Sequence, residues 1–198
     1  MNKRVLRIYF LISIVGLLAV YFFWPKYEKL PILETVSSFQ LENVHGGTYS
    51  LNNEKIKLVT FFYTHCPDIC PMTMMDLMKL QAQLQKEGIF GNKVELVAIS
   101  LDPENDTPKV IKRYSEGFSA DPLGWKWLRG SEGDTKEIAN SLKMQYQKLE
   151  GDFFSHSTTM FLLDDENNIR ALYDMAISDN PIDTTKILED ISILIEGY

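Results

Sequence analysis

The stretch Thr64-His65-Cys66-Pro67-Asp68-Ile69-Cys70-Pro71 decides the fold, and it contains both cysteines of the chain. It follows an apolar run and leads into a helical pattern that begins near Met72. Pro71 fits the first turn of that helix, whereas in the interior it would lose the hydrogen bond to the carbonyl four residues back. The sequence therefore predicts a buried strand, a tight loop that carries Cys66, and a helix with Cys70 at its mouth.

The spacing of the cysteines indicates a reactive pair. Across one tight turn, the two sulfur atoms can share a metal ion or close a disulfide. A helix N-terminus favours the thiolate over the thiol, so we expect at least one reactive sulfur. Two inert core cysteines are the alternative, but a Cys-x-x-x-Cys pattern flanked by prolines exposes sulfur rather than filling a core.

Length and composition limit the class of protein. A chain of 198 residues with 45% hydrophobic content is long enough for one well-buried domain and an appendage. The formal net charge of −7 argues against nucleic-acid binding, which needs a basic surface. Two cysteines cannot complete a four-cysteine site, and His45, His65 and His156 lack the close spacing of a Cys₂His₂ finger. A structural metal is therefore not expected.

The N-terminus has the pattern of a membrane anchor. Residues 1–7 are basic, and the uncharged apolar run 8–24 ends in aromatic residues. A cleaved signal peptide is the alternative, but no small-x-small cleavage pattern follows the run. We therefore predict an uncleaved signal-anchor transmembrane helix over 1–24, a charged tether over 25–36 and a single domain over 37–198.

The charges around this run predict its orientation. Basic residues before the helix and an aromatic belt after it place the N-terminus in the cytoplasm, by the positive-inside rule. The domain then lies on the extracytoplasmic side of the cell membrane. That compartment is oxidising, so a cysteine pair in it is a disulfide, a redox couple or a metal site.

The rest of the chain alternates between strand and helix patterns. Two short strands over 39–41 and 48–51, joined by a Gly-Gly turn, predict an N-terminal β-hairpin. The further elements are strands at 57–63, 94–101, 125–128, 158–163 and 169–173, and helices at 72–86, from Pro108 onward, at 132–143 and at 181–195. This order predicts an α/β, thioredoxin-like fold with an N-terminal β-hairpin extension. Open sheets of this kind hold reactive groups at the carboxyl ends of central strands, where the cysteine loop falls.

His156 is the residue that best completes a site with the two cysteines. It stands just before the strand 158–163, and in thioredoxin-like proteins the loop at this place faces the cysteine turn and normally carries a cis-proline. This sequence has no proline there, so His156 offers an imidazole as a third metal ligand. The alternative is that His156, like most lone histidines ahead of a strand, is structural.

Four other residues are weaker candidates. Asp102 ends a central strand on the cysteine side of the sheet, and it either lies near the site or structures its own loop. Met72 and Met75 are the methionines nearest the cysteines and offer thioether ligands, although a methionine-rich helix face is more often core packing. His45, in the Gly-Gly turn, is expected to be a solvated turn residue.

Two motifs of this sequence resemble the Sco/SenC family. They are Phe-Phe-Tyr-Thr-His-Cys-Pro-Asp-Ile-Cys-Pro at 61–71 and Ser-Leu-Asp-Pro-Glu-Asn-Asp-Thr-Pro at 100–108, and His156 precedes a strand and an Asp-x-x-Asn turn. Members of this family are membrane-anchored copper proteins with a thioredoxin-like fold that serve assembly of cytochrome c oxidase. The resemblance implies copper ligands at Cys66, Cys70 and His156.

By this resemblance the protein is a copper metallochaperone rather than an enzyme. It holds one copper ion, as Cu(I) or Cu(II), takes it from an unidentified donor and delivers it to the binuclear copper site of cytochrome c oxidase subunit II. In some members an acidic residue near the second motif also affects copper binding, and Asp102 is the position that matches.

The alternatives are a thiol–disulfide oxidoreductase or thiol peroxidase that uses Cys66 and Cys70 as its redox pair, and a copper or redox sensor. The three-residue spacing argues against the oxidoreductase, whose motif has two residues between its cysteines.

Overall fold

The structure, a computed structural model, describes residues 3–23, 29–149 and 154–197. An eight-stranded sheet in the order β1-β10-β9-β4-β5-β6-β2-β3 forms its centre, and β7 and β8 form a separate two-stranded sheet. The central strands β4, β5 and β6 are parallel, and all other neighbours in the large sheet are antiparallel. The strands are β1 (Glu34–Thr35), β2 (Gln40–Asn43), β3 (Thr48–Ser50), β4 (Ile56–Phe62), β5 (Val94–Ser100), β6 (Trp125–Arg129), β7 (Tyr146–Lys148), β8 (Phe154–His156), β9 (Thr159–Leu163) and β10 (Asn168–Asp174).

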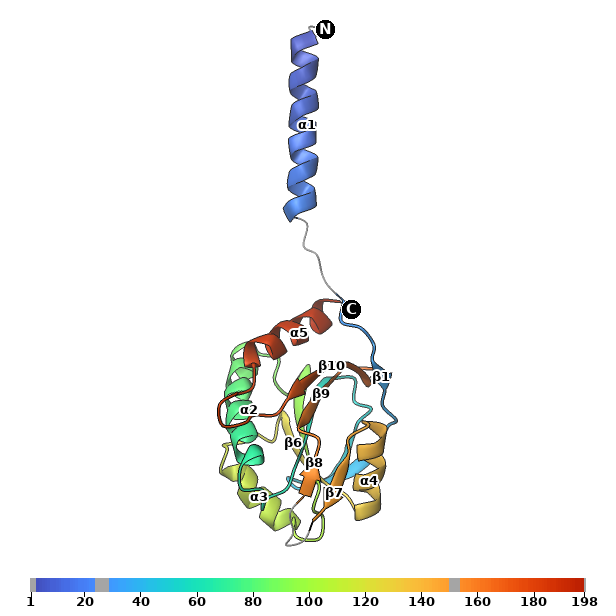
Figure 1. Ribbon diagram of the computed structural model, residues 1–198, viewed down its shortest axis with the longest axis vertical. Coiled ribbons are helices and arrows are strands. Elements are labelled where there is room, and N and C mark those ends of the chain that lie inside the picture. Colours follow the sequence, from blue (N-terminus) through green and yellow to red (C-terminus); the bar gives the residue numbers. More distant parts are fainter. Residues whose placement is uncertain (1–2, 24–28, 150–153, 198) are drawn as a thin grey trace.

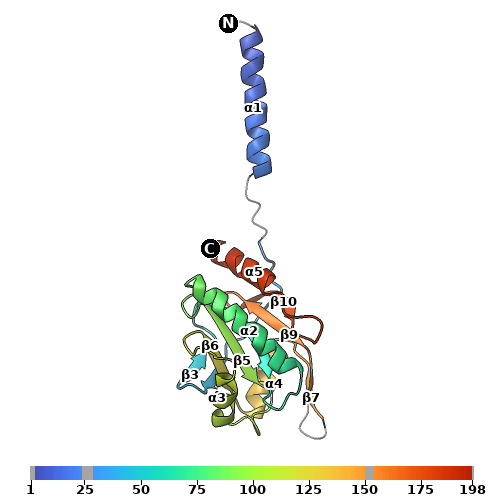
Figure 2. The ribbon, with the colours of Figure 1, turned by 90° about the vertical axis from the view of Figure 1, so that its left-hand side faces the viewer.

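Helices cover both faces of the large sheet (Figures 1 and 2). The helices α2 (Ile69–Lys86), α3 (Pro108–Glu116) and α5 (Thr184–Glu196) contribute to one apolar cluster. The helix α4 (Glu132–Ser141) contributes to a second cluster, on the opposite face. This layering agrees with the predicted thioredoxin-like arrangement, and β2 and β3 form the predicted N-terminal hairpin.

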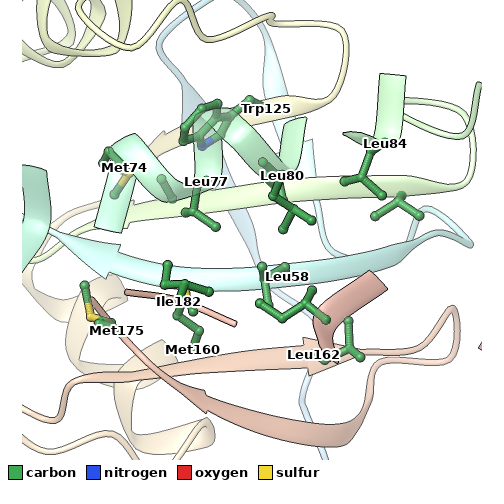
Figure 3. Packing of buried hydrophobic residues seen from close by; sticks show 14 of the residues in the cluster. Leu58, Met74, Leu77, Leu80, Leu84, Trp125, Met160, Leu162, Met175 and Ile182 are labelled. Atoms are coloured by element: carbon green, nitrogen blue, oxygen red, sulfur yellow. The ribbon is translucent and has the colours of Figure 1, made fainter. Parts of the chain in front are cut away.

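The apolar stripe of α2 fixes this helix on the sheet. Met74, Leu77, Leu80 and Leu84 recur at helical spacing, are fully buried, and face Leu58 of β4 in the core (Figure 3). Burying each such side chain contributes about 1.5–3 kcal/mol. The N-terminal end of α2 is therefore held in place by the packing of the turns that follow it.

The strand β4 is buried over its whole length, which explains why its apolar run does not alternate. Lys57 is buried with it, and its Nζ donates a hydrogen bond to Oδ1 of Asn167 at 2.7 Å. Burial lowers the pKa of Lys57 to about 8. The carboxyl end of this central strand leads directly into the cysteine loop.

The N-terminal helix α1 (Lys3–Phe23) lies within the range predicted as a membrane anchor. In the part of the chain that the structure describes, no helix is both long and apolar enough to cross a membrane. Residues 24–28, at the end of the predicted anchor and the start of the predicted tether, lie outside the described residues. The strand β1 falls inside the range 25–36, because Glu34 and Thr35 pair with β10. The anchor and its orientation therefore stay predictions.

The start of α2 differs from the prediction. The helix begins at Ile69 instead of near Met72, and Asp68 is its N-cap residue. Pro71 is the third helical residue, where a backbone N–H would have no partner within the helix, so it is tolerated there. Cys70 consequently lies inside the first turn and not at the helix mouth.

The hairpin of β7 and β8 was not predicted. His156 is the last residue of β8, where the sequence indicated a loop, and it pairs with Tyr146 of β7. By contrast, the predicted start of α3 is confirmed: Thr107 is the N-cap residue, and its side chain accepts a hydrogen bond from the N–H of Val110.

Candidate functional site

The two cysteines lie where β4 ends and α2 begins. Cys66 is half-buried in the loop, and Cys70 is completely buried in the first turn of the helix. Both are free cysteines, and each is the largest cause of the shifted pKa of the other. The fold thus brings the two sulfurs together without a disulfide.

The sulfur of Cys66 accepts hydrogen bonds from the helix N-terminus. The Cys70 thiol, the backbone N–H groups of Asp68 and Cys70, and the hydroxyl of Tyr63 all stabilise it as a thiolate. Together they lower the pKa of Cys66 to about 5; the bond from the Cys70 thiol is the largest cause, and burial acts in the opposite direction. Asp68 makes no side-chain cap bond. The N–H groups at the start of α2 instead favour the ionised form of the Cys66 sulfur.

Cys70, by contrast, is stabilised in its protonated, thiol form. Its hydrogen bond to the Cys66 sulfur is the largest cause and burial is the second, and both raise the pKa of Cys70 well above its usual range. At neutral pH the pair accordingly consists of one thiolate and one thiol. The more exposed sulfur, that of Cys66, is the nucleophile.

Asp106 was not predicted as a site residue, yet it fixes the start of the cysteine loop. Its carboxylate accepts hydrogen bonds from the N–H of Thr64 at 3.2 Å, from the Thr64 hydroxyl, and from the hydroxyl of Ser100 at 2.6 Å. Burial raises the pKa of Asp106, and these hydrogen bonds oppose the rise. The signal for it was present in the motif 100–108, which holds two aspartates at the end of a central strand.

Asp102 structures its own loop, which is one of the two outcomes that the sequence left open. Its carboxylate accepts hydrogen bonds from Nδ2 of Asn105 at 2.8 Å and from the N–H of the same residue at 3.4 Å. The acidic side chain that bonds to the cysteine loop is therefore that of Asp106.

His156 lies beside Tyr63, with the two rings edge to face and their centroids 6.3 Å apart. Its Nδ1 lies 2.9 Å from the carbonyl oxygen of Ser157. Because a carbonyl oxygen only accepts, Nδ1 carries the proton, and Nε2 of the neutral ring keeps a lone pair that can bind a metal.

The three predicted ligands do not form one cluster. Within the described ranges, no group of three or more His, Cys, Asp or Glu side chains is arranged to hold a metal ion. The ring of Tyr63 meets that of His156, and Tyr63 is also one of the causes of the lowered pKa of Cys66. The structure thus places both cysteines where β4 ends and α2 begins, and His156 beside Tyr63 at the end of β8.

The three other candidates, Met72, Met75 and His45, differ in how far they are buried. Met72 is partly buried against the apolar cluster under α2, whereas Met75 is 52% exposed. His45 is half-buried rather than solvated, because its turn packs against α3 and its Nε2 lies 3.3 Å from Oγ of Ser115. Burial, followed by the charge of Lys112, lowers the pKa of His45.

A thiolate and a thiol at a helix N-terminus, on a thioredoxin-like sheet, define a domain that binds soft metals or exchanges disulfides. Comparison with known proteins identifies the family of the chain. The model of the SCO1/SenC family matches residues 30–192, so the chain belongs to the SCO1/SenC family.

Individual relatives agree with this assignment. A SCO1 protein homolog of Bacillus subtilis is 30% identical over 168 residues, which are 82% of this chain and 84% of the relative. The structure of ScoI from Arabidopsis thaliana with copper bound is 28% identical, with a TM-score of 0.68 over 83% of this chain and 99% of that one. The structure of BsSco, described as having a disulfide switch and as a member of the Sco family of cytochrome c oxidase assembly proteins, is 28% identical, with a TM-score of 0.70 over 82% and 94%.

The unequal thiols predict unequal reactivity. In the reduced, copper-free protein, we expect iodoacetamide to label Cys66 and to leave the buried Cys70 unmodified. Because the pKa of Cys66 is lowered to about 5, the rate constant should stay nearly constant as the pH falls to about 6. It should then fall about tenfold per pH unit below about 5, where the thiol is protonated. Mass spectrometry of the labelled peptides identifies the site.

The unfolded chain is the control for this measurement. In denaturant both cysteines should react, with a midpoint at about pH 8.5. A folded protein whose labelling rate still rose between about pH 7 and 8.5 would contradict the assignment of Cys66 as the thiolate.

Proposed function

We propose that this protein binds one copper ion through Cys66, Cys70 and His156 and delivers it to the binuclear copper site of cytochrome c oxidase subunit II. The observation that carries the proposal is the pair of free cysteines where β4 ends and α2 begins, with Cys66 half-buried in the loop and Cys70 buried in the first turn. Copper bound to a relative of the same fold supports the identity of the metal.

The donor atoms suit copper chemically. Two sulfurs and an imidazole are soft ligands that favour Cu(I), and the same set holds Cu(II) when a water or a carboxylate completes a flatter geometry. Cys66 is already a thiolate, so metal binding has to displace a proton from Cys70 only. Nε2 of His156 is the nitrogen that would bind, because Nδ1 is engaged with Ser157.

Delivery requires that a partner can reach the ion. Cys66 is half-buried in a loop at the edge of the sheet, so the ligands of an acceptor can approach it and exchange stepwise. The acceptor in this proposal is subunit II of the oxidase, and the donor of copper to this chain is a protein that we do not identify. Membership of a relative in a family of oxidase assembly proteins supports the choice of acceptor.

A thiol–disulfide exchange function is the second candidate. The lowered pKa of Cys66 suits a nucleophile that attacks a partner's disulfide, and a disulfide switch is described for a relative. In that case the chain would reduce the cysteines of the acceptor instead of loading them with metal.

The copper site predicts the effect of removing each ligand. In the reduced domain without its N-terminal segment, Cys66→Ser, Cys70→Ser and His156→Ala should each weaken copper binding. Loss of a direct ligand should exceed the about 10- to 100-fold loss that an outer-shell partner causes. Affinity should also fall on acidification, because the ligands must be deprotonated. Competition titration against a chelator of known affinity measures these changes.

The matched control is His45→Ala, which removes a half-buried imidazole that bonds to α3. It should leave the copper affinity within about twofold of the parent, in keeping with its lack of a ligand role. An affinity of His156→Ala equal to that of the parent would show that the site has no imidazole ligand.

We also propose that residues 1–24 anchor the protein in the cell membrane as a single-pass helix. Support comes from the basic residues Lys3, Arg4 and Arg7 ahead of an uncharged apolar run, and from the helical conformation of α1. The copper-binding domain would then lie outside the cytoplasm.

This topology predicts how the full-length chain fractionates. It should stay with the membranes after an alkaline wash, because a spanning helix is not released with peripheral proteins. Protease should digest its domain only from the outer side of intact cells. A mature protein that begins near Pro25, or a soluble product in the medium, would show instead that the segment is cleaved.

Delivery and reduction predict different behaviour in cells. In a strain that lacks this protein, His156→Ala with both cysteines intact should fail to restore oxidase activity, because copper binding needs the imidazole. Added copper should restore the activity in part. A thiol reductase does not need an imidazole for sulfur exchange. Full restoration by His156→Ala without added copper would therefore favour the reductase over the copper chaperone.

A further inference from the structure

The turn that joins β2 to β3 is fixed on β6 and lies beside α3 (Figure 2). The N–H of Val44 donates to the carbonyl oxygen of Trp127 in β6 at 3.0 Å. The side chain of Val44 packs against the apolar cluster to which α3 contributes. Oδ1 of Asn43 accepts a hydrogen bond from the N–H of His45 at 3.2 Å. These contacts hold the backbone of the turn, and the ring of His45 meets α3.

The contact of His45 with α3 fixes which ring nitrogen carries the proton. Nε2 lies 3.3 Å from Oγ of Ser115, and the hydroxyl of Ser115 donates its single proton to the carbonyl oxygen of Lys112 at 2.8 Å. Oγ of Ser115 can therefore only accept from His45, so Nε2 is the protonated nitrogen of the neutral ring. Nδ1 keeps the lone pair, and it is buried without a hydrogen-bond partner among the residues that the structure describes.

The surroundings of the ring oppose the uptake of a second proton. The charged groups that face it are Lys112 and Glu116 of α3 and Lys126 of β6, two cations against one anion. An imidazolium ring would place its new N–H at the buried Nδ1, where no acceptor lies in the described part of the chain. Burial, followed by the charge of Lys112, accordingly lowers the pKa of His45, and Glu116 opposes part of this effect.

We infer that His45 is an acid-sensitive contact, which holds the β2–β3 turn against α3 at neutral pH and releases the turn when the ring is protonated. The geometry carries this inference. The neutral ring is bonded to α3 through Nε2, and the second proton must go to a buried nitrogen without an acceptor. The inference is independent of the function proposed above, because it concerns the metal-free fold and none of the proposed copper ligands.

The turn is the part of the hairpin that can open while the domain stays folded. β2 pairs with β6 over only two residues of each strand, and β3 lies at the edge of the large sheet. The other end of the hairpin is held more firmly, because Tyr49 of β3 is buried and its hydroxyl donates to Oε2 of Glu95 at 3.1 Å. Acid is therefore expected to open the turn and to leave the rest of the hairpin attached.

The direction of the pH dependence follows from the two states of the ring. In the released turn the imidazole is in water and has a pKa of about 6.5, whereas in the closed turn the pKa of His45 is lower. The released turn therefore binds the proton more tightly, and acid favours release. The stabilisation that His45 contributes is complete above about pH 7. It is lost as the pH falls from about 6.5 through the lower pKa of the closed turn.

The test measures hydrogen exchange of the Val44 amide in the full-length, reduced and metal-free chain, kept in a non-ionic detergent. The protection factor compares the exchange rate with that of an unstructured chain at the same pH. It should be constant above about pH 7 and should fall by up to about tenfold per pH unit below about 6.5, because release takes up one proton. Amides in α2 and α5 should stay protected, which shows that the domain remains folded.

His45→Gln removes the titration and keeps a side-chain N–H that can donate to Ser115. In this variant the protection factor of the Val44 amide should be the same at pH 7 and at pH 5. His65→Gln is the matched control, because His65 is an exposed histidine elsewhere in the chain. It should leave the pH dependence of the parent unchanged.

Charge variants on α3 test the surroundings with opposite signs. By NMR titration, Lys112→Met should raise the pKa of His45 and Glu116→Gln should lower it. The loss of Val44 protection at pH 5 should be correspondingly smaller in Lys112→Met and larger in Glu116→Gln than in the parent. A parent whose Val44 amide is equally protected at pH 7 and pH 5 would overturn the inference, as would a His45→Gln chain that loses protection to the same extent as the parent.

Discussion

The interaction of the Cys66 sulfur with the Cys70 thiol and with the first turn of α2 is the constraint on which the site depends. The N–H groups at a helix start need acceptors, and the side chain of Asp68 supplies none. A thiolate accepts such hydrogen bonds better than a thiol does. The N–H groups at the start of α2 therefore favour the ionised form of Cys66. The Cys70 thiol is the largest cause of the lowered pKa of Cys66, and the N–H groups of the first turn and Tyr63 add to its effect.

Two parallel strands set the position of that helix start. β4 and β5 pair in register up to Phe62 and Ser100, so their carboxyl ends meet at one edge of the sheet. The loops that follow are joined by Asp106, which bonds to Thr64 in the cysteine loop. This buried carboxylate accepts hydrogen bonds from the cysteine loop and from Ser100 at the end of β5, and it is costly to disturb because each unsatisfied donor costs about 1–3 kcal/mol. The cysteine loop is thus held at the carboxyl end of the sheet by hydrogen bonds to a buried carboxylate.

The sequence predicted the features that local pattern determines and missed those that depend on tertiary contacts. β4 and β5 are buried on both faces, so their apolar runs were recognisable as central strands. The β7–β8 hairpin was not recognisable, because three-residue strands have no readable period and these two are held by ring contacts of Phe154. Likewise, Asp102 and Asp106 belong to one motif, and only the turn in which the N–H of Asp106 bonds to the carbonyl of Asp102 decides which carboxylate reaches the cysteine loop.

In the unequal pair, copper binding and disulfide exchange both require the proton of Cys70 to leave. In the second step of an exchange reaction, Cys70 must lose its proton and attack the mixed disulfide that Cys66 has formed, and burial opposes its ionisation. A cation bound by both sulfurs removes this obstacle in a different way, because it neutralises the charge that burial penalises and replaces the proton of Cys70. The environment that keeps Cys70 protonated in the free protein therefore disfavours a free dithiolate far more than it disfavours a dithiolate with a bound cation.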